Sequence, residues 1–520
     1  MKLNRLLLSA AFAAATLPAL IAQTLEPPKL VLLVAADQFR GDYLFRFRAD
    51  YKSGLKRLLD EGAVFTNGYY DHAPTVTAIG HSVMLTGAMP SASGIVGNEW
   101  YDRASGKQVT NVSDPSVQTL GSPSREGASP HRLLVSTIGD ELKMRGATPA
   151  KVIGVSIKDR GAILAAGRMA DGAFWYDAAT GNFVSSTWYG QALPAWAQKF
   201  NDSRVIDQFA GKTWTPAWGG EPFLTLPAAG KALWSKIGGT SYGNDMVGLF
   251  AAAALEGENL GRNGGTDILT VSFSSNDSIG HDKGPDSPEV RDVSIRTDVV
   301  LGRLLDLVDK RVGLKNVLVI FTADHGVAPL PELSQKRRMP GGRLSSKEVR
   351  DTVDAALSAK FGEDKWVVGL SGPGPYLDHA LIARKGLSLE EVQNVAARAV
   401  RDMPHIARVY TREDLRRGLS SDDMATRRIN NGFFYQRASD IAIIAEPYWM
   451  FSSSGTTHGT PWNYDAHVPM AFLGPWMKRG HYAQRVIVND IAATVASIVG
   501  VPMPSGCSGR PLTEALTGRP

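Results

Sequence analysis

The chain of 520 residues has one cysteine, Cys507, and no long hydrophobic run beyond its amino-terminal segment. A single cysteine excludes an intrachain disulfide and a zinc site built from cysteines, so a metal would need aspartate, histidine and oxygen ligands. There is no basic block or basic stripe interleaved with aromatic residues, and the formal net charge is only +5, so nothing supports a nucleic-acid-binding module. The remaining composition, 43% apolar and 21% charged, is typical of a globular protein.

The amino-terminal segment differs from the rest of the chain. Lys2 and Arg5 precede an apolar stretch over residues 6–15, and small residues follow it. This order is typical of a secretory signal peptide, here residues 1–22, and is too short to span a bilayer stably. The sequence therefore predicts an exported protein, periplasmic or secreted, without stable membrane insertion after the signal is removed.

Strand-like and helix-like segments alternate along most of the chain, which favours a doubly wound α/β fold: a mostly parallel central sheet with helices on both faces. Expected helices cover residues 51–61, 131–145, 251–256, 287–310 and 490–499, and expected strands include residues 151–157 and 468–473. Residues 170–245, rich in tryptophan, glycine and proline, are expected to form long loops at the sheet edge.

A chain of this length exceeds what one hydrophobic core usually supports. Residues 340–440 contain two helix starts with capping-box patterns, at Ser345 and Ser388, and short strands expected at 377–383 and 406–410. We interpret them as an inserted α+β subdomain. The predicted organisation is a signal peptide over 1–22, a catalytic domain over 23–339 and 441–520, and the subdomain over 340–440.

Three hydrophobic runs each lead into an aspartate. They are residues 29–37, 267–277 and 316–324, and they end at Asp37, Asp277 and Asp324. Continuous Val/Ile/Leu runs are typical of parallel strands buried on both faces. Ligands of such sheets collect outside the carboxyl ends of the strands, so the three carboxylates are expected at one edge.

Histidines accompany these aspartates. His281 follows Asp277 by four residues, where an irregular turn is expected to aim both at one ion, and His325 is adjacent to Asp324. His458 lies in a loop flanked by glycine. A lone aspartate after a strand is usually a cap or a turn residue, but the whole set favours a site for two zinc ions with nitrogen and oxygen ligands.

A hydroxyl nucleophile is expected in residues 75–82, Thr-Val-Thr-Ala-Ile-Gly-His-Ser. A hydroxyl at the start of a short helix lies where backbone N–H groups favour an approaching anion. The local pattern does not choose between Thr75 and Thr77, and either one could simply cap the helix. Zinc coordination could make a threonine alkoxide accessible at neutral pH.

Lys158 and Arg160 follow another expected strand. Residues two apart in an extended segment point the same way, so both side chains are expected to converge on one target. An arginine fork beside a lysine suits phosphoryl oxygens, whereas an isolated Lys-x-Arg is usually a surface pair. Asn98 could donate an amide hydrogen bond to the same anion, or be only a turn residue.

Taken together, these residues resemble the alkaline phosphatase superfamily, and more narrowly the bacterial two-zinc phosphatases of the phosphate-irrepressible, PafA-like type, which use threonine as nucleophile. The segments that carry the resemblance are 77–81, 156–160, 276–281, 322–326 and 458–459. By this resemblance Thr77 is the nucleophile, because its spacing to His81 matches the family pattern. The implied ligands of one zinc are Asp37, Thr77, Asp324 and His325, and those of the other are Asp277, His281 and His458.

The resemblance also implies that Asn98, Lys158 and Arg160 hold the nonbridging phosphoryl oxygens of small-molecule phosphate monoesters. The expected activity is a broad phosphomonoesterase working through a phosphothreonine intermediate. Two alternatives remain: a phosphodiesterase or nucleotide pyrophosphatase on the same scaffold, and a non-catalytic exported binding protein. The oligomeric state is not determined by the sequence, and a monomer is compatible with it.

Overall fold

The computed structural model describes residues 25–122, 126–420 and 422–517. The expected signal peptide, residues 1–22, lies outside the described residues. Within the described ranges, no helix combines the length and the apolar character needed to cross a bilayer.

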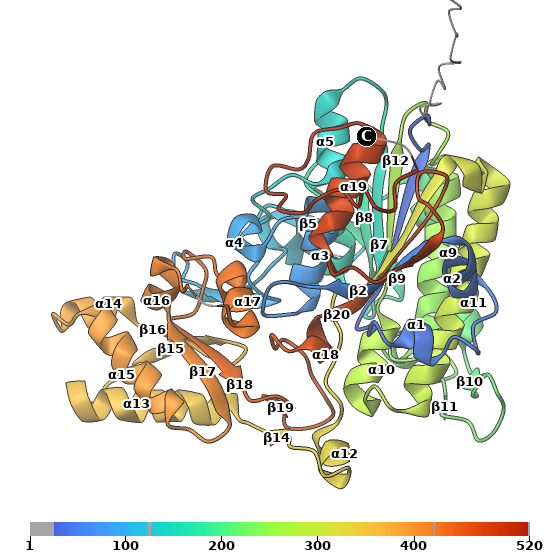
Figure 1. Cartoon of the computed structure of the whole chain (residues 1–520). Coiled ribbons are helices and arrows are strands. Elements are labelled where there is room, and N and C mark those ends of the chain that lie inside the picture. The colour runs from blue at the N-terminus through green and yellow to red at the C-terminus, as the bar shows by residue number, and fades with distance from the viewer. Residues whose placement is uncertain (1–24, 123–125, 421, 518–520) are drawn as a thin grey trace, which may run out of the picture.

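The larger part of the molecule is built on one twelve-stranded sheet (Figure 1). Its strands in spatial order are β21 (Gly480–Tyr482), β2 (Ala63–Tyr69), β20 (His467–Leu473), β13 (Val317–Thr322), β1 (Leu30–Ala36), β12 (Asp267–Phe273), β7 (Val152–Ser156), β8 (Gly172–Asp177), β9 (Asn182–Ser186), β5 (Ser113–Leu120) and β6 (Glu126–Ala128), with β22 (Val486–Ile487) beside β2. The central pairs β13–β1, β1–β12, β12–β7 and β7–β8 are parallel. The strand β20 is antiparallel to both of its neighbours, so the sheet is mixed but mostly parallel in its centre.

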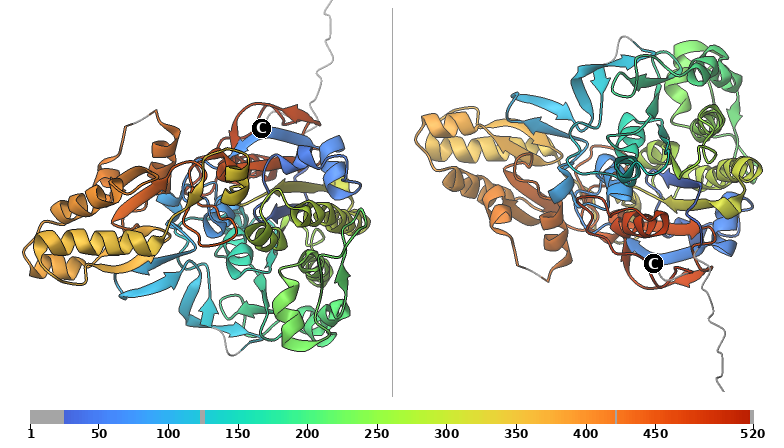
Figure 2. Two further views of the ribbon diagram at one scale, coloured as in Figure 1. Left: turned by 90° about the horizontal axis from the view of Figure 1, so that it is seen from below. Right: turned by 90° about the horizontal axis from the view of Figure 1, so that it is seen from above.

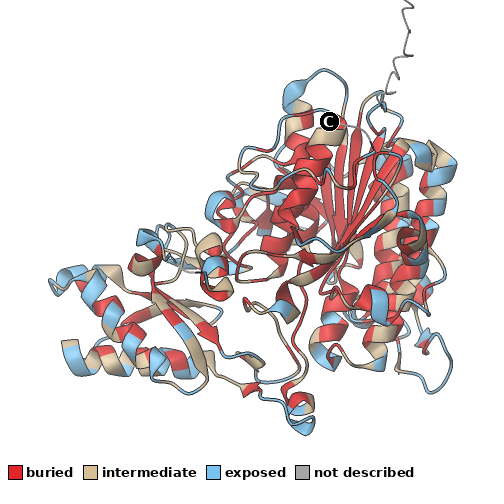
Figure 3. Cartoon of the chain, viewed as in Figure 1, coloured by how far each residue is buried: buried red, intermediate tan, exposed pale blue. Residues whose placement is uncertain are grey.

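Helices cover both faces of this sheet. On one side lie α2 (Gly54–Glu61), α9 (Ser241–Gly257) and α11 (Pro288–Val312), and on the other α3 (Thr77–Thr86), α5 (Ile138–Arg145), α6 (Asp159–Ala166) and α19 (Asn489–Val499). Every residue of β1, β12 and β13 is buried, as Figure 3 shows for the centre of the sheet. This is why these strands are continuous apolar runs rather than alternating ones. The predicted α/β class is confirmed.

The expectation of long loops over residues 170–245 is wrong. This region contributes β8 and β9 to the main sheet, and it also forms α7 (Ala195–Asp202), α8 (Gly230–Ile237) and the start of α9. All six residues of β8 are buried, including Phe174, Trp175 and Tyr176. These aromatic residues are core residues of a strand that is parallel to β7 and antiparallel to β9.

The helix expected over residues 131–145 is shorter in the structure, where α5 begins only at Ile138. Thr137 is its N-cap: the threonine hydroxyl accepts from the backbone N–H of Asp140, and the Asp140 carboxylate accepts from the backbone N–H of Thr137. This capping box fixes the start of the helix. The residues before it form turns instead.

A smaller unit projects from the sheet domain (Figures 1 and 2). It packs α13 (Ser346–Phe361) and α15 (Leu389–Arg401) with two antiparallel strand pairs around a separate apolar cluster. One pair is the hairpin of β15 (Val367–Ser371) and β16 (Gly374–Leu377), and the other joins β17 (Ile406–Thr411) to the more distant β18 (Ile441–Ala445). The expected inserted α+β subdomain is confirmed as part of the fold.

Three local expectations for this subdomain have different outcomes. The side chains of Ser345 and Ser388 cap α13 and α15 as expected, each by accepting a backbone hydrogen bond three residues on. The strand expected over 377–383 is wrong, because β16 ends at Leu377 and Asp378 caps the helix α14 (His379–Arg384). The boundary at residue 440 stays a prediction. Because β18 pairs with β17, we propose that the subdomain ends later, near Phe451.

Candidate metal centre and active site

The candidate site lies at the carboxyl ends of four adjacent strands. The strands β13, β1, β12 and β7 are neighbours in the sheet and parallel to one another. Asp324 follows β13, Asp37 follows β1, Asp277 follows β12 and Lys158 follows β7. A parallel sheet places these chain segments at one edge, and the structure brings all four side chains into one buried cluster.

Asp277 and His281 are held by a helix rather than by the irregular turn expected from the sequence. The strand β12 ends at Phe273, and both residues belong to α10 (Ser275–Lys283). Residues four apart lie on the same side of a helix. The result is a distance of 3.1 Å between His281 Nε2 and Asp277 Oδ1.

Three histidines present the same nitrogen to the cluster. The Nδ1 atoms of His281, His325 and His458 lie 2.7, 2.9 and 2.8 Å from the backbone carbonyl oxygens of Thr456, Gly326 and Thr75, respectively. A carbonyl only accepts, so each Nδ1 carries a hydrogen, and Nε2 is the ring nitrogen that faces the cluster. His325 Nε2 lies 3.5 Å from an oxygen of Asp37, and His458 Nε2 lies 3.7 Å from Asp277 Oδ1.

The carboxylates of the cluster are crowded together and hidden from solvent. Burial and the nearby charges of Asp277 and Asp324 raise the pKa of Asp37 to about 7, and burial raises the pKa of Asp324 to about 6. Burial acts the same way on Asp277, but the charge of Lys158 and the hydrogen bond with His281 outweigh it and lower its pKa. Three buried carboxylates this close together need nearby positive charge to remain ionised.

Lys158 supplies part of that charge. Its Nζ lies 2.6 Å from an oxygen of Asp37 and 2.6 Å from an oxygen of Asp277. Burial alone would lower the pKa of Lys158, but the charges of Asp277 and Asp37 prevail and raise it. The ammonium also lies 3.5 Å from Thr77 Oγ1, so it contacts the nucleophile candidate as well as the carboxylates.

The donor set fits divalent metal ions. Asp277, His281 and His458 form one group whose ligand atoms lie within 4.8 Å of one another, and Asp37, Asp277 and His325 form a second. Asp37 Oδ1 and Asp324 Oδ2 are buried oxygens without a hydrogen-bond partner among the described residues. Carboxylate oxygens and neutral imidazole Nε2 atoms, with no thiolate, suit zinc and related ions.

Thr77 is the first residue of α3, as expected for a hydroxyl at a helix start, and it is buried. Its Oγ1 lies 3.4 Å from His325 Nε2. The hydroxyl of Thr75 instead donates to the backbone carbonyl of Thr460, and the carbonyl of Thr75 accepts from His458. Of the two threonines that the local pattern left open, Thr77 has its hydroxyl among the clustered side chains.

The two remaining phosphate-binding candidates lie around Thr77. Asn98 Oδ1 accepts a hydrogen bond from the backbone N–H of Ala78 at 3.0 Å, which ties the asparagine to the start of α3. The extended geometry expected for Lys158 and Arg160 is wrong, because Lys158 is the N-cap of α6 and Arg160 lies in its first turn. The charge of the Arg160 guanidinium opposes the increase in the pKa of Lys158 without reversing it. The buried Nε of Arg160 has no hydrogen-bond partner among the described residues.

Two further residues of the site were not identified as such from the sequence. Gln38 donates from its side chain to Asp277 Oδ1 at 2.7 Å and from its backbone to Asp324 Oδ1 at 3.0 Å. His81 lies one helical turn after Thr77, with Nδ1 2.9 Å from the Thr77 carbonyl and Nε2 2.8 Å from Ser272 Oγ. The position of Gln38 directly after Asp37 was the only available signal for it.

The fold and the site define an α/β protein with a candidate Asp/His metal centre beside a buried hydroxyl. The chain belongs to the type I phosphodiesterase / nucleotide pyrophosphatase family, whose pattern matches residues 31–468. The family resemblance inferred from the motifs is confirmed by full-length relatives. Alkaline phosphatase PafA of Elizabethkingia meningoseptica is 36% identical over 94% of each chain, and alkaline phosphatase PhoV of Synechococcus elongatus is 35% identical over 96% of this chain and 95% of its own.

Solved structures of PafA agree with this relationship. The crystal structure of wild-type PafA superimposes with a TM-score of 0.88 at 34% identity, covering 95% of this chain and 99% of that one. A structure of a PafA variant, similar with a TM-score of 0.87, has four substituted positions: a threonine, an asparagine, a lysine and an arginine. The threonine and asparagine are 21 positions apart, as are Thr77 and Asn98, and the lysine and arginine are two apart, as are Lys158 and Arg160.

Proposed function

We propose that this protein is an exported, metal-dependent phosphomonoesterase that hydrolyses small-molecule phosphate monoesters through a phosphothreonine intermediate on Thr77. One observation carries the proposal. The Thr77 hydroxyl lies at the start of a buried helix, 3.4 Å from His325 Nε2 and 3.5 Å from Lys158 Nζ, beside carboxylates and imidazoles that suit divalent cations. The named activity of the relatives PafA and PhoV supports the same conclusion.

The bond changes are two displacements at phosphorus. A bond forms between Thr77 Oγ and phosphorus as the bond from phosphorus to the alcohol oxygen breaks. Water then cleaves the Oγ–phosphorus bond and releases inorganic phosphate. Over the cycle water supplies a proton to the alcohol and a hydroxyl to the phosphate, and the threonine hydroxyl is restored.

The proposed cofactors are two zinc ions. Asp37, Thr77, Asp324 and His325 would hold one, and Asp277, His281 and His458 the other. Bound zinc would supply Lewis acidity and positive charge next to the reacting oxygens. With the carboxylates neutralised, the ammonium of Lys158 would be free to turn from Asp37 and Asp277 toward a phosphoryl oxygen.

Lys158, Arg160 and Asn98 favour a monoester over the diester that the family description also allows. A monoester dianion carries one more negative charge than a diester, and an arginine fork beside an ammonium stabilises that charge. The unpartnered Nε of Arg160 is available for such an anion. The shared spacing with the four positions substituted in PafA supports the same assignment.

The deciding experiment compares kcat/KM for an aryl phosphate and a methyl aryl phosphate. We expect the purified mature protein to prefer the monoester strongly. Arg160→Ala should reduce monoester cleavage more than diester cleavage, because the diester lacks the extra charge. A preference for the diester would instead support the phosphodiesterase alternative, and bound metal without turnover of either ester would support a binding protein.

The metal assignment has a separate test. Elemental analysis should find about two zinc ions per chain, as the two ligand groups imply. Chelation should lower the melting temperature as well as remove activity, because uncompensated buried carboxylates destabilise the fold. Zinc should restore both. An unchanged melting temperature and metal content after chelation would contradict the assignment.

The remaining parts of the proposal concern partners and location. We expect the protein to be exported to the periplasm or the medium once residues 1–22 are removed, to act on dissolved esters and to bind neither nucleic acid nor membrane. A monomer is compatible with the fold. Secretion of the full chain, with loss of the amino-terminal segment seen by mass spectrometry, would test the location.

A further inference from the structure

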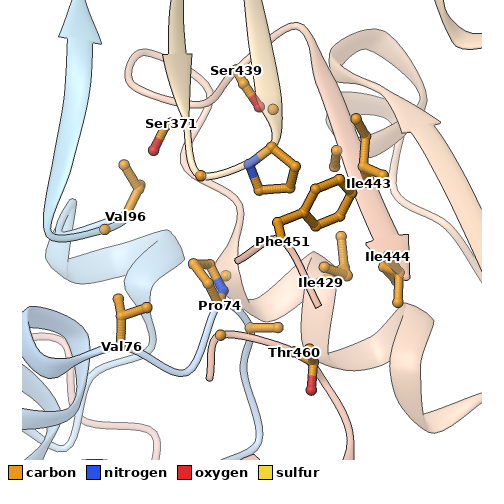
Figure 4. Close-up of a pocket in the computed structure, with 18 of the residues that line it drawn as sticks. Pro74, Val76, Val96, Ser371, Ile429, Ser439, Ile443, Ile444, Phe451 and Thr460 are labelled. Atoms are coloured by element: carbon orange, nitrogen blue, oxygen red, sulfur yellow. The ribbon is translucent and has the colours of Figure 1, made fainter. Parts of the chain in front are cut away.

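A cavity of about 380 Å³ lies between the sheet domain and the inserted subdomain. Figure 4 shows its walls. Val76 and Val96 line it from the sheet domain, and Ile429, Ile443 and Phe451 line it from the α17 (Met424–Gly432), β18 and β19 (Trp449–Met450) region of the chain. The inserted unit therefore forms one wall of a cavity that the sheet domain alone would leave open.

This cavity borders the active site. Asn98 and His458 line it, and Val76 directly precedes Thr77. Asn98 is tied to the start of α3, and His458 is 3.7 Å from Asp277. A phosphoryl group attached to Thr77 and held by Asn98 would therefore have the cavity next to it.

The lining is suited to an uncharged, apolar group. Among the described residues that line the cavity, none is a lysine or an arginine, and the one carboxylate is that of the exposed Glu99. The serine and threonine residues of the lining supply a few polar contacts. Its volume falls within the ~300–1,000 Å³ range of small-molecule sites, which are mostly apolar with a few polar groups.

We propose that this cavity binds the alcohol part of the phosphate monoester and favours apolar or aromatic alcohols, with the inserted subdomain setting that preference. The inference rests on the proposed function, because a monoester carries a single organic group, the alcohol that leaves. Ile443 and Phe451 contribute to the preference by contact with that group. Phosphorylated sugars and other strongly polar alcohols would gain little from these walls.

A binding experiment tests the cavity without turnover. Isothermal titration calorimetry on the metal-loaded full chain compares 1-naphthylphosphonate with methylphosphonate, which share the anionic end and differ in the organic group. We expect the naphthyl compound to bind at least tenfold more tightly, which corresponds to about 1.4 kcal/mol. Equal affinity of the two phosphonates would overturn the proposal.

Matched variants assign the preference to the subdomain wall. Ile443→Asn should remove most of the difference between the two phosphonates. Ile406→Asn is the control, because Ile406 is also partly buried against the subdomain cluster but does not line the cavity. If Ile443→Asn does not fold, Ala442→Trp provides a second test by filling the cavity from the same strand. If a folded Ile443→Asn or Ala442→Trp variant still binds 1-naphthylphosphonate more tightly than methylphosphonate by the same factor as the wild type, the subdomain wall does not set the preference.

Turnover separates this inference from the function on which it rests. The ratio of kcat/KM for 1-naphthyl phosphate to that for methyl phosphate should fall about tenfold in Ile443→Asn relative to the wild type. An unchanged ratio with both esters hydrolysed would reject the cavity role and leave the phosphomonoesterase intact. If neither ester released phosphate, the phosphomonoesterase proposal would be rejected. The calorimetric comparison of the two phosphonates would still show whether the cavity binds an apolar group, because it needs no turnover. If Ile443→Asn changed only the cleavage of diesters, and only according to the organic group that stays on phosphorus, the cavity would bind that group rather than the leaving alcohol. This result would overturn the proposal.

Discussion

At the scale of single residues, Gln38 connects the two groups of proposed metal ligands. Its side chain donates to Asp277 and its backbone N–H donates to Asp324, across 239 and 286 positions of sequence. Its φ of 61° is uncommon for a residue other than glycine. An unusual backbone conformation held beside clustered carboxylates indicates that the local structure is set by the site rather than by the preference of the residue.

Gln38→Leu should weaken zinc binding by about 10–100-fold, because hydrogen bonds to ligating carboxylates orient them for the metal. The measurement is a zinc titration against a competing chelator. Gln393→Leu is the control: Gln393 is also a buried glutamine that donates to an aspartate, Asp440, in the subdomain. That variant should lose stability and keep its zinc affinity. Equal zinc affinity of Gln38→Leu and the wild type would show that Gln38 does not position the ligands.

Thr77→Ala should abolish turnover, by at least about a thousandfold as expected for loss of a nucleophile, and should leave the fold intact. The hydroxyl makes only contacts of 3.4 and 3.5 Å, so its loss removes no strong hydrogen bond. Steady-state rates and the melting temperature check the two parts.

Thr75→Val is the matched control, because Thr75 was the other candidate in the same segment. Its hydroxyl donates to a backbone carbonyl at 2.9 Å, and losing that bond should destabilise the protein by about 1 kcal/mol. Turnover should survive. Activity in Thr77→Ala together with inactivity of a folded Thr75→Val would move the nucleophile to Thr75.

The ligand candidates could be found from the sequence because each follows a strand or lies in a short motif. Asp37, Asp277 and Asp324 end apolar runs, and this pattern needs no tertiary information. The contacts of Gln38 and His81 could not be found in this way. They depend on which strands are neighbours and on where α3 packs, and both are properties of the folded chain.

At the scale of elements, helices place the chemistry more often than extended segments do. Asp277 and His281 share a face of α10, and Arg160 lies in the first turn of α6. The sequence placed these residues correctly after strands but could not show how soon each helix begins. Helix starts depend on caps and packing as well as on periodicity, so the boundaries were less predictable than the elements.

The approach of α3 to the Asp324 segment depends on a glycine. A Cβ added at Gly80 would lie 2.6 Å from the Cα of Asp324. This is a steric clash with backbone atoms, which cannot move aside as a flexible side chain could. Gly80→Ala should therefore displace α3, and Thr77 with it. We expect a destabilisation of about 1–3 kcal/mol from overpacking and a fall in kcat/KM of at least about tenfold from the misplaced hydroxyl.

Gly238→Ala is the control for this change, measured by the same melting curves and rates. Gly238 has a right-handed helical conformation at the end of α8, and a Cβ there would lie 3.9 Å from Ile157. Alanine should be tolerated, with activity close to that of the wild type. Comparable losses in the two variants would indicate that close approach at Gly80 is not what positions Thr77.

At the scale of the whole molecule, the α/β class followed from the alternation of elements, whereas the contact between the two units did not. Hydrogen bonds join the hairpin of β3 (Glu99–Asp102) and β4 (Lys107–Thr110) to β15: Ser371 donates to the carbonyl of Glu99, and Gln108 donates to that of Leu370. Asp440 accepts from Arg103, which lies in the turn of this hairpin, at 2.9 Å. Such contacts join residues hundreds of positions apart, and no local sequence pattern predicts them.

Asp440 should stabilise the molecule in a pH-dependent way. Burial alone would raise its pKa, but the hydrogen bond with His379 and the charge of Arg103 prevail and lower it. A lowered folded-state pKa means that the stabilisation is present above the unfolded value, about 3.9, and is lost as the pH falls through the folded value. Asp440→Asn should therefore lower the free energy of unfolding by about 3 kcal/mol at neutral pH, as for a buried ion pair that loses one partner. Denaturant unfolding measured at several pH values should show this difference in free energy shrinking below about pH 4. Glu390→Gln, which removes an exposed pair with Arg417, should change stability by less than about 1 kcal/mol. A difference for Asp440→Asn that is independent of pH would show that its carboxylate charge does not join the two units.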